Sequence, residues 1–226
     1  MLTNFSFGRF HFGILLTILL ISFQQTGYSQ LLDPTTHPKF VNPLPVIKEA
    51  GLRVDLTKGG EHLTVQMKDT SQWLGLVDVN DNNAQLMTTV WGYKFPGLPT
   101  HYPSPTIVAK KNKKVFIEWR ADNLPGQFLP VDASLHMAHP NDITTISGVR
   151  AWYAAGNVPV VTHLHGGHTE SASDGLPEAW FTQSGNDKGQ YWMKQEYQYD
   201  NTQESATLWY HDHALGITRL NVYAEN

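Results

Sequence analysis

Residues 158–165, which read VPVVTHLH, show the pattern that decides the fold. Side chains two apart along a β-strand point the same way, about 7 Å from each other along the backbone. His163 and His165 therefore share one face of such a strand. The opposite face carries Val158, Val160, Thr162 and Leu164. Because that second face is mostly apolar, the stretch is expected to be a strand with its imidazoles turned away from a core.

A second stretch, residues 206–213, reads ATLWYHDH and repeats the arrangement. His211 and His213 fall on one side, together with Thr207 and Trp209. The other side carries Ala206, Leu208, Tyr210 and Asp212. If the two strands are neighbours, four imidazoles converge on one patch. Spacing alone assigns no metal, because about 0.5 His-x-His pairs are expected by chance in a chain with this many histidines. Imidazole also suits copper, zinc, iron and nickel alike.

The rest of the chain also has the two-residue period of strands. Leu63, Val65 and Met67 alternate with polar residues, and Val115, Ile117 and Trp119 share one face of a later strand. Residues 191–199 are expected to form another strand, and turn-forming residues cluster between the runs, as at 78–83 and 122–126. No long helical period competes with this pattern. The sequence therefore predicts an all-β sandwich or small barrel.

The N-terminal region is expected to lie outside this β-domain. Residues 1–29 have a positive start, an apolar run from Phe12 to Phe23 and small residues before Gln30, which together are typical of a secretory signal peptide. An uncleaved membrane anchor is the alternative, although the run is shorter than the roughly 20 residues that a spanning helix needs. Residues 30–58 are rich in proline and are predicted to be an extended arm, followed by a domain at 59–226. The mature chain is expected to be secreted or periplasmic, with no membrane segment.

Charge and cysteine content narrow the classes of function. The net charge of the chain is −4, and no stripe of basic residues indicates a nucleic-acid partner. The lysines at 110–114 are expected to solvate a turn between strands. The sequence contains no cysteine. Since a blue-copper site needs a thiolate ligand, this chain cannot build a type 1 copper site.

Longer motifs around both histidine pairs carry a family resemblance. Residues 162–181, THLHGGHTESASDGLPEAWF, resemble the first copper motif of bacterial multicopper oxidases of the spore-coat laccase and bilirubin oxidase type. Residues 208–224, LWYHDHALGITRLNVYA, resemble the second motif. The likeness extends through the short segments 32–34, 39–45, 105–107 and 123–125. It thus covers nearly all of the chain after the signal peptide.

The resemblance implies a Greek-key cupredoxin-like domain and a set of copper ligands. In this family the first domain supplies four histidines to a three-copper cluster. On that basis His163 is expected at the type 2 copper, and His165, His211 and His213 at the type 3 pair. Asp174 matches an acid held near the cluster, where it is expected to assist proton delivery or orient a ligand; its other interpretation is an ordinary turn residue. The resemblance also implies that the domain lacks its last strand and is truncated at its C-terminus.

The family reaction couples oxidation of a phenolic, aminophenolic, tetrapyrrole or metal-ion reductant to the four-electron reduction of dioxygen to water. The resemblance assigns the second half of the cluster and the blue copper to a later domain, so the second and third cupredoxin domains are the expected partners. The chain is therefore expected to bind copper but to be inactive as an oxidase alone. A non-catalytic exported protein that binds or buffers copper is the alternative. A mononuclear zinc enzyme is a third interpretation, which leaves one histidine idle.

Other residues near the motifs receive structural interpretations. His168 is expected to be a loop histidine. His136 and His139 are expected in a solvated loop, with a secondary copper or substrate-entrance role as the alternative. Trp209 and Tyr210 are expected to serve in core and strand packing.

Overall fold

The computed structural model describes residues 32–44, 46, 52–122 and 124–224. The predicted signal peptide, residues 1–29, lies outside the described residues. The chain divides into one unit at Met1–Pro38 and a second at Lys39–Asn226. In the described part of the first unit, Asp33 begins a turn. Its carboxylate accepts a hydrogen bond from the backbone N–H of Thr35 at 2.9 Å. All described helices and strands belong to the second unit.

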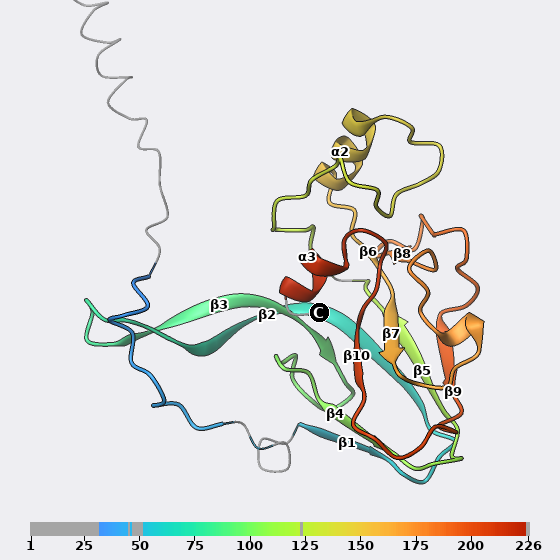
Figure 1. Ribbon diagram of the computed structural model, residues 1–226, viewed down its shortest axis with the longest axis horizontal. Helices are drawn as coiled ribbons and strands as arrows, with labels where there is room; N and C mark the ends of the chain where they lie inside the picture. Colours follow the sequence, from blue (N-terminus) through green and yellow to red (C-terminus); the bar gives the residue numbers. More distant parts are fainter. Residues whose placement is uncertain (1–31, 45, 47–51, 123, 225–226) are drawn as a thin grey trace, which may run out of the picture. The chain divides into compact units, whose positions relative to one another are not determined.

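The largest sheet of the described residues has four strands in the order β3-β2-β5-β9. Its strands are β2 (His62–Asp78), β3 (Ala84–Lys94), β5 (Val115–Arg120) and β9 (Glu196–Tyr199). β2 pairs antiparallel with β3 and parallel with β5, and β5 pairs antiparallel with β9. The predicted alternation is confirmed here, since Val65, Met67, Ile117 and Trp119 are buried. Figure 1 shows that the β2–β3 hairpin extends beyond the strands next to it.

Three two-stranded sheets complete the strand set of the described residues. They pair β1 (Arg53–Leu56) with β4 (Thr106–Ala109), β6 (Pro159–Val160) with β8 (Phe181–Thr182), and β7 (Thr162–His165) with β10 (Trp209–Asp212). β1 lies inside the segment predicted as an extended arm, 30–58. Its parallel pairing with β4 and the burial of Leu56 make it part of the folded domain.

Two predicted strands are shorter in the structure than in the sequence pattern. Of residues 191–199 only Glu196–Tyr199 are a strand, and of residues 206–213 only Trp209–Asp212. Residues 158–165 form β6 and β7, which are interrupted at Val161. There the backbone N–H of Val161 donates to a carboxylate oxygen of Asp212 at 3.0 Å instead of to a strand neighbour. The side chain of Asp212 thus takes the place of a backbone acceptor at Val161. This residue separates the pairing of β6 with β8 from the pairing of β7 with β10.

An aromatic core connects the large sheet to the β7–β10 sheet. The ring of Tyr93 on β3 lies 5.3 Å from that of Trp119 on β5 and 5.2 Å from that of Tyr210 on β10. Such edge-to-face contacts between buried rings add to the stability from apolar burial. The hydroxyl of Tyr210 also donates to the backbone carbonyl of Pro105 at 2.6 Å. The packing interpretation of Tyr210 therefore agrees with its place in the core.

The helices of the described residues are short. They are α2 (Ile146–Ala154), α3 (Thr218–Tyr223) and the 3₁₀ turn η1 (Ser171–Ser173). α2 was not expected from the sequence, and it begins at an N-cap, where the hydroxyl of Thr145 accepts from the N–H of Gly148. Because strands dominate, the predicted all-β class is confirmed. Among the described residues no helix is long and apolar enough to cross a membrane.

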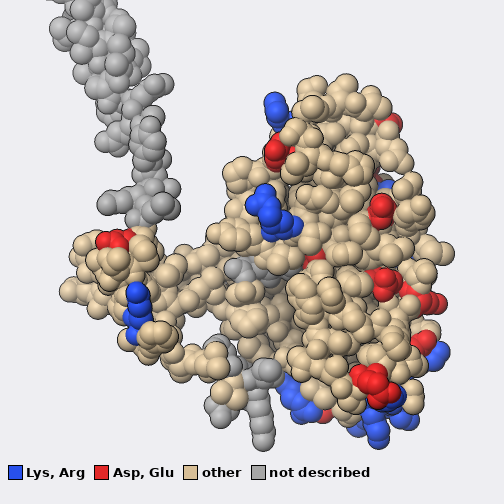
Figure 2. All heavy atoms as spheres, in the orientation of Figure 1, with Lys and Arg blue, Asp and Glu red and all other residues tan. Residues whose placement is uncertain are grey.

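The lysine cluster at 110–114 lies in the turn between β4 and β5, as predicted. Lys111 pairs with Glu204 at 2.5 Å, and Lys114 pairs with Asp200 at 3.2 Å. Figure 2 shows basic and acidic side chains mixed on this face of the molecule. Acidic neighbours thus offset part of the positive charge of the turn.

Candidate metal centre

The pairing of β7 with β10 brings the two histidine pairs together. The strands are antiparallel, with His163 opposite His211 and His165 opposite Trp209. Directly opposed residues of an antiparallel pair project from the same face of the sheet. On the other face, Leu164 and Tyr210 pack against the core. The convergence of four imidazoles, which the sequence made conditional on the two strands being neighbours, is therefore present.

The four imidazole rings form a close group. The ring of His163 lies 4.8 Å from that of His213, 5.7 Å from that of His211 and 5.8 Å from that of His165, measured between centroids. The ring of His211 lies 5.7 Å from that of His165 and 5.5 Å from that of His213. Each ring thus has at least two other imidazoles of the group within 5.8 Å.

Backbone carbonyls hold three of the four rings through Nδ1. The Nδ1 of His163 lies 2.5 Å from the carbonyl oxygen of Asp174, that of His211 lies 2.6 Å from that of Asp212, and that of His213 lies 3.2 Å from that of Gly175. A carbonyl can only accept, so each Nδ1 carries the proton and each Nε2 keeps its lone pair. Metal-binding histidines in proteins are usually held in this way, which fixes both the tautomer and the ring orientation.

The unpaired nitrogen of His211 fits a metal ligand. Among the described residues, its Nε2 is one of the few buried side-chain nitrogen or oxygen atoms with no hydrogen-bond partner. Leaving such an atom unsatisfied costs stability unless another group binds it. Burial is the main cause that lowers the pKa of His211, and burial together with the nearby His163 ring lowers the pKa of His213. Both rings are therefore neutral near pH 7, as a ligand must be.

Asp174 contacts His163 mainly through its backbone. Its carbonyl accepts from Nδ1 of His163, whereas its carboxylate oxygen Oδ1 lies 3.8 Å from the same nitrogen. That carboxylate accepts a hydrogen bond from the hydroxyl of Thr169. The next residue, Gly175, has φ of +70°, and a Cβ added there would lie 2.1 Å from the carbonyl oxygen of Thr162. Glycine at 175 therefore lets the loop lie directly against β7.

A buried carboxylate lies behind the histidine face. Asp212 is fully buried and accepts from the N–H groups of Val161 at 3.0 Å and Ala214 at 3.1 Å, and from the amide of Asn221 at 3.0 Å. Burial raises the pKa of its carboxyl to about 7, although these three hydrogen bonds oppose the rise. Sequence reasoning missed this group. The signal was present, because a charged residue occupied the core-facing side of residues 206–213.

Trp209 differs from its sequence interpretation. Rather than packing in the core, it is 54% exposed and lies on the histidine face. Its ring stacks on the imidazole of His211 at 4.0 Å and on that of His165 at 5.2 Å. The two-residue period places Trp209 on the same side as His211, and the register of the strands sets it opposite His165. Trp209 therefore covers two imidazoles at the edge of the group.

The other histidines lie apart from this group. His168 is in a loop, where its Nδ1 lies 3.4 Å from the hydroxyl of Thr202. His136 and His139 line a separate cavity of about 150 Å³, together with Glu178 and Trp180. Within the part of the chain that the structure describes, no group of three or more His, Cys, Asp or Glu side chains is arranged to hold one metal ion.

An all-β domain with four convergent imidazoles has the donor set of a histidine-ligated metal protein, and comparison with known proteins identifies the family. The family model described as "Multicopper oxidase" matches residues 154–223, which include all four histidines. A laccase of Bacillus subtilis is 38% identical over 190 residues, which cover 84% of this chain and 32% of that laccase. A laccase of Bacillus stratosphericus is 41% identical over 138 residues, covering 61% of this chain and 23% of that protein.

The chain belongs to the multicopper oxidase family. It spans about a third or less of the length of these laccases, 32% and 23%. A solved structure, the McoA multicopper oxidase of Aquifex aeolicus, aligns with 76% of this chain and 26% of that protein, at 16% identity and a TM-score of 0.44.

Proposed function

We propose that this domain binds copper and supplies one half of the ligand set of a multicopper-oxidase cluster. His163 would bind the type 2 copper, and His165, His211 and His213 would bind the type 3 pair. The observation that carries the proposal is the group of imidazoles held through Nδ1, with the buried, unpartnered Nε2 of His211 among them. When bound, the three coppers would supply the electron transfer that reduces dioxygen.

In this proposal the four histidines are divided among three copper ions. No single ion then needs three nitrogen ligands from this domain. The described residues accordingly contain no three-ligand group for one metal. A zinc site made of three histidines and a bound water would need such a group. The proposal therefore divides the four histidines among several copper ions.

The remaining residues would keep the imidazoles neutral and correctly turned. The carbonyls of Asp174, Asp212 and Gly175 hold the protonated Nδ1 atoms, which would leave the Nε2 atoms free to bind the metals. The Asp174 carboxylate, which lies 3.8 Å from Nδ1 of His163, would orient this ligand or assist proton delivery to the cluster. In the complete enzyme the reaction would oxidise a small reductant, of the phenolic, aminophenolic, tetrapyrrole or metal-ion class, and consume dioxygen. The chain itself would be exported.

Titration with Cu(II) tests the proposal directly. The purified chain should bind Cu(II) with the EPR spectrum of a flat, imidazole-rich, non-blue site, because it has no thiolate to offer. His163→Ala combined with His211→Ala should abolish this binding. His168→Ala, in the nearby loop, is the matched control and should leave it unchanged. Equal stoichiometry in the double variant, or preferential binding of zinc with hydrolase activity, would reject the proposed site.

A second function is favoured by the absence of cysteine. The chain cannot form a blue-copper site, so electrons from a reductant would have no type 1 entry point within it. A protein with the histidine group alone could bind and buffer copper outside the cell without catalysis. Copper exchange with a competing chelator, measured together with dioxygen consumption, separates the two functions: buffering requires reversible binding and no turnover.

A further inference from the structure

The loop between β7 and β8 controls two of the four imidazoles. It supplies the carbonyl of Asp174 to His163 and the carbonyl of Gly175 to His213. His211 is different, because its carbonyl partner is Asp212 on its own strand, β10. Any displacement of the loop would therefore turn His163 and His213 while leaving His211 in place.

Ser173 attaches this loop to the edge of β9. Its side chain is completely buried, and its hydroxyl both accepts and donates. It accepts from the backbone N–H of Gln198 at 2.9 Å and donates to a carboxylate oxygen of Glu170 at 3.0 Å. Gln198 pairs with Phe116 of β5 on its other side, so this N–H lies on the edge of the sheet that faces the loop, where Thr169 also forms an antiparallel bridge with Tyr199. The attachment is one residue before the Asp174 carbonyl.

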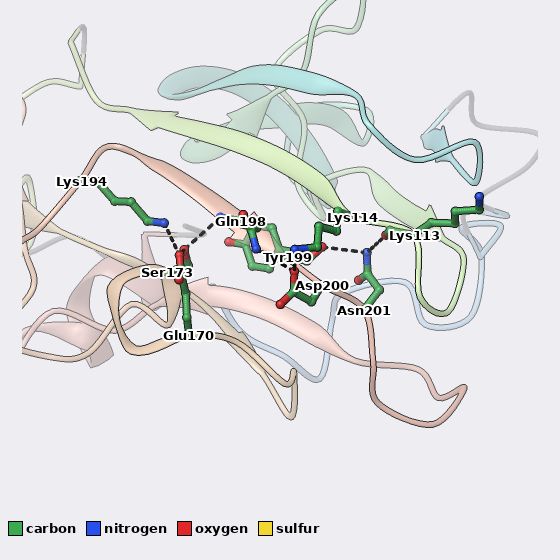
Figure 3. Close-up of polar contacts among 9 residues, drawn as sticks. All are labelled: Lys113, Lys114, Glu170, Ser173, Lys194, Gln198, Tyr199, Asp200 and Asn201. Atoms are coloured by element: carbon green, nitrogen blue, oxygen red, sulfur yellow. Dashed lines mark hydrogen bonds and ion pairs between the residues drawn. The ribbon is translucent and has the colours of Figure 1, made fainter.

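Glu170 and Lys194 hold the hydroxyl of Ser173 in this orientation. The same carboxylate oxygen of Glu170 that accepts from Ser173 also accepts from the ammonium group of Lys194. Figure 3 shows Lys194, Glu170, Ser173 and Gln198 as one connected series of polar contacts. The hydrogen bond from Lys194 is the main cause that lowers the pKa of Glu170, and that from Ser173 is the second. The carboxylate therefore remains ionised and able to accept both bonds.

We infer that Ser173, supported by Glu170 and Lys194, is a positioning residue for the metal ligands His163 and His213. It fixes the loop on β9, and the loop carbonyls then fix the two imidazoles. The inference rests on the proposed function, because positioning matters only if these histidines bind copper. Groups that hold a ligating histidine in other metalloproteins affect metal affinity by roughly 10- to 100-fold.

A second set of contacts in Figure 3 provides a control. At the far end of β9, Asp200 accepts from the amide of Gln198 at 2.8 Å and pairs with Lys114 at 3.2 Å. The amide of Asn201 donates to the carbonyl of Lys113 at 2.7 Å. The contacts with Lys113 and Lys114 connect the end of β9 to the turn before β5 and include neither Ser173 nor the carbonyls of Asp174 and Gly175. Lys114→Met thus perturbs the same strand without touching the ligand-holding carbonyls.

The test uses ¹⁵N NMR of the metal-free chain and Cu(II) titration of the same samples. In the unmodified protein, His163, His211 and His213 should all show the Nδ1-protonated tautomer. Ser173→Ala should shift His163 and His213 toward a mixture of tautomers, leave His211 unchanged and weaken Cu(II) binding about 10-fold. Lys114→Met should change neither. Glu170→Gln, which keeps an acceptor for the serine, should stay close to the unmodified protein, whereas Glu170→Ala should resemble Ser173→Ala.

Two results would overturn the inference. The first is that the signals of His163 and His213 do not change in Ser173→Ala. The second is that the signals of all three histidines change equally, which would indicate a general loss of structure around the site. If Ser173→Ala fails to fold, Lys194→Met at the exposed end of the series should move the same two histidines less strongly, and no movement would also overturn it. Because the NMR reads the metal-free chain, it tests positioning even if copper does not bind. If the unmodified chain does not bind copper, the proposed function is rejected instead.

Discussion

At the scale of single residues, Asp212 lies between the proposed ligands His211 and His213 in the sequence. Its side chain points to the opposite side of the strand, into the protein. Its carboxylate satisfies three buried donors, from Val161, Ala214 and Asn221. Asp212→Ala would leave these donors without a partner, and each unsatisfied buried group costs about 1–3 kcal/mol. We expect Asp212→Ala to lower the free energy of unfolding by roughly 3 kcal/mol or more. Urea denaturation of the metal-free chain measures this.

Asp200→Asn is the control for that change. The carboxylate of Asp200 is partly exposed, and its pKa is lowered first by the hydrogen bond from Gln198 and then by that from Lys114. Removing a surface contact of this kind costs about 0–1 kcal/mol. If Asp212→Ala is no more destabilising than Asp200→Asn, the buried network does not support the histidine strand in the way that its contacts indicate.

Some features of the site could be predicted from the sequence, and others could not. The common face of His211 and His213 followed from the two-residue period, and that period is a local property of any strand. The carbonyls that hold His163 and His213 belong to a separate loop, and no pattern in residues 166–175 states where that loop lies. For Trp209 the same period gave the correct side of the strand but not its exposure. Whether a residue on that side is buried depends on which other segments cover it, and that is a tertiary property.

At the scale of elements, the β2–β3 hairpin has two unlike halves. Near its base, Val65 and Met67 on β2 and Val90 on β3 are almost completely buried. Toward its tip, Leu74, Leu76 and Met87 are exposed. A two-stranded ribbon without a packed face is marginally stable in water. The sequence predicted the strand from alternation near residue 65, but alternation cannot show where the core ends beneath it.

This difference predicts unequal hydrogen exchange along one pair of strands. Amides of residues 63–68 and 90–94 should exchange only through near-global unfolding, because this part of the hairpin contains the buried residues Val65, Met67, Val90, Trp91 and Tyr93. Amides of residues 71–77 and 84–88 should exchange much faster through local opening. Native-state exchange followed by mass spectrometry or NMR measures both sets in one sample. Equal protection along the hairpin would contradict the expectation and would show that the distal half is covered.

At the scale of the whole molecule, the chain combines a group of four neighbouring histidines with a complete lack of cysteine. A thiolate ligand is what gives a blue-copper site its role as the entry point for electrons. The chain aligns with only 32% of the Bacillus subtilis laccase. Under the proposed function, the domain would bind copper through its histidines but would have no type 1 copper to receive electrons from a reductant.

We accordingly expect no oxidase turnover from the copper-loaded chain alone. Dioxygen consumption with a phenolic reductant should equal that of the His163→Ala and His211→Ala double variant, and both should equal free copper at the same concentration. The Bacillus subtilis laccase provides the positive control under identical conditions. Free copper can oxidise phenols slowly, so the comparison with the double variant, rather than with buffer, decides the result. Turnover that depends on His163 and His211 would show that the histidine group reduces dioxygen without a type 1 copper, and the half-site interpretation would then be wrong.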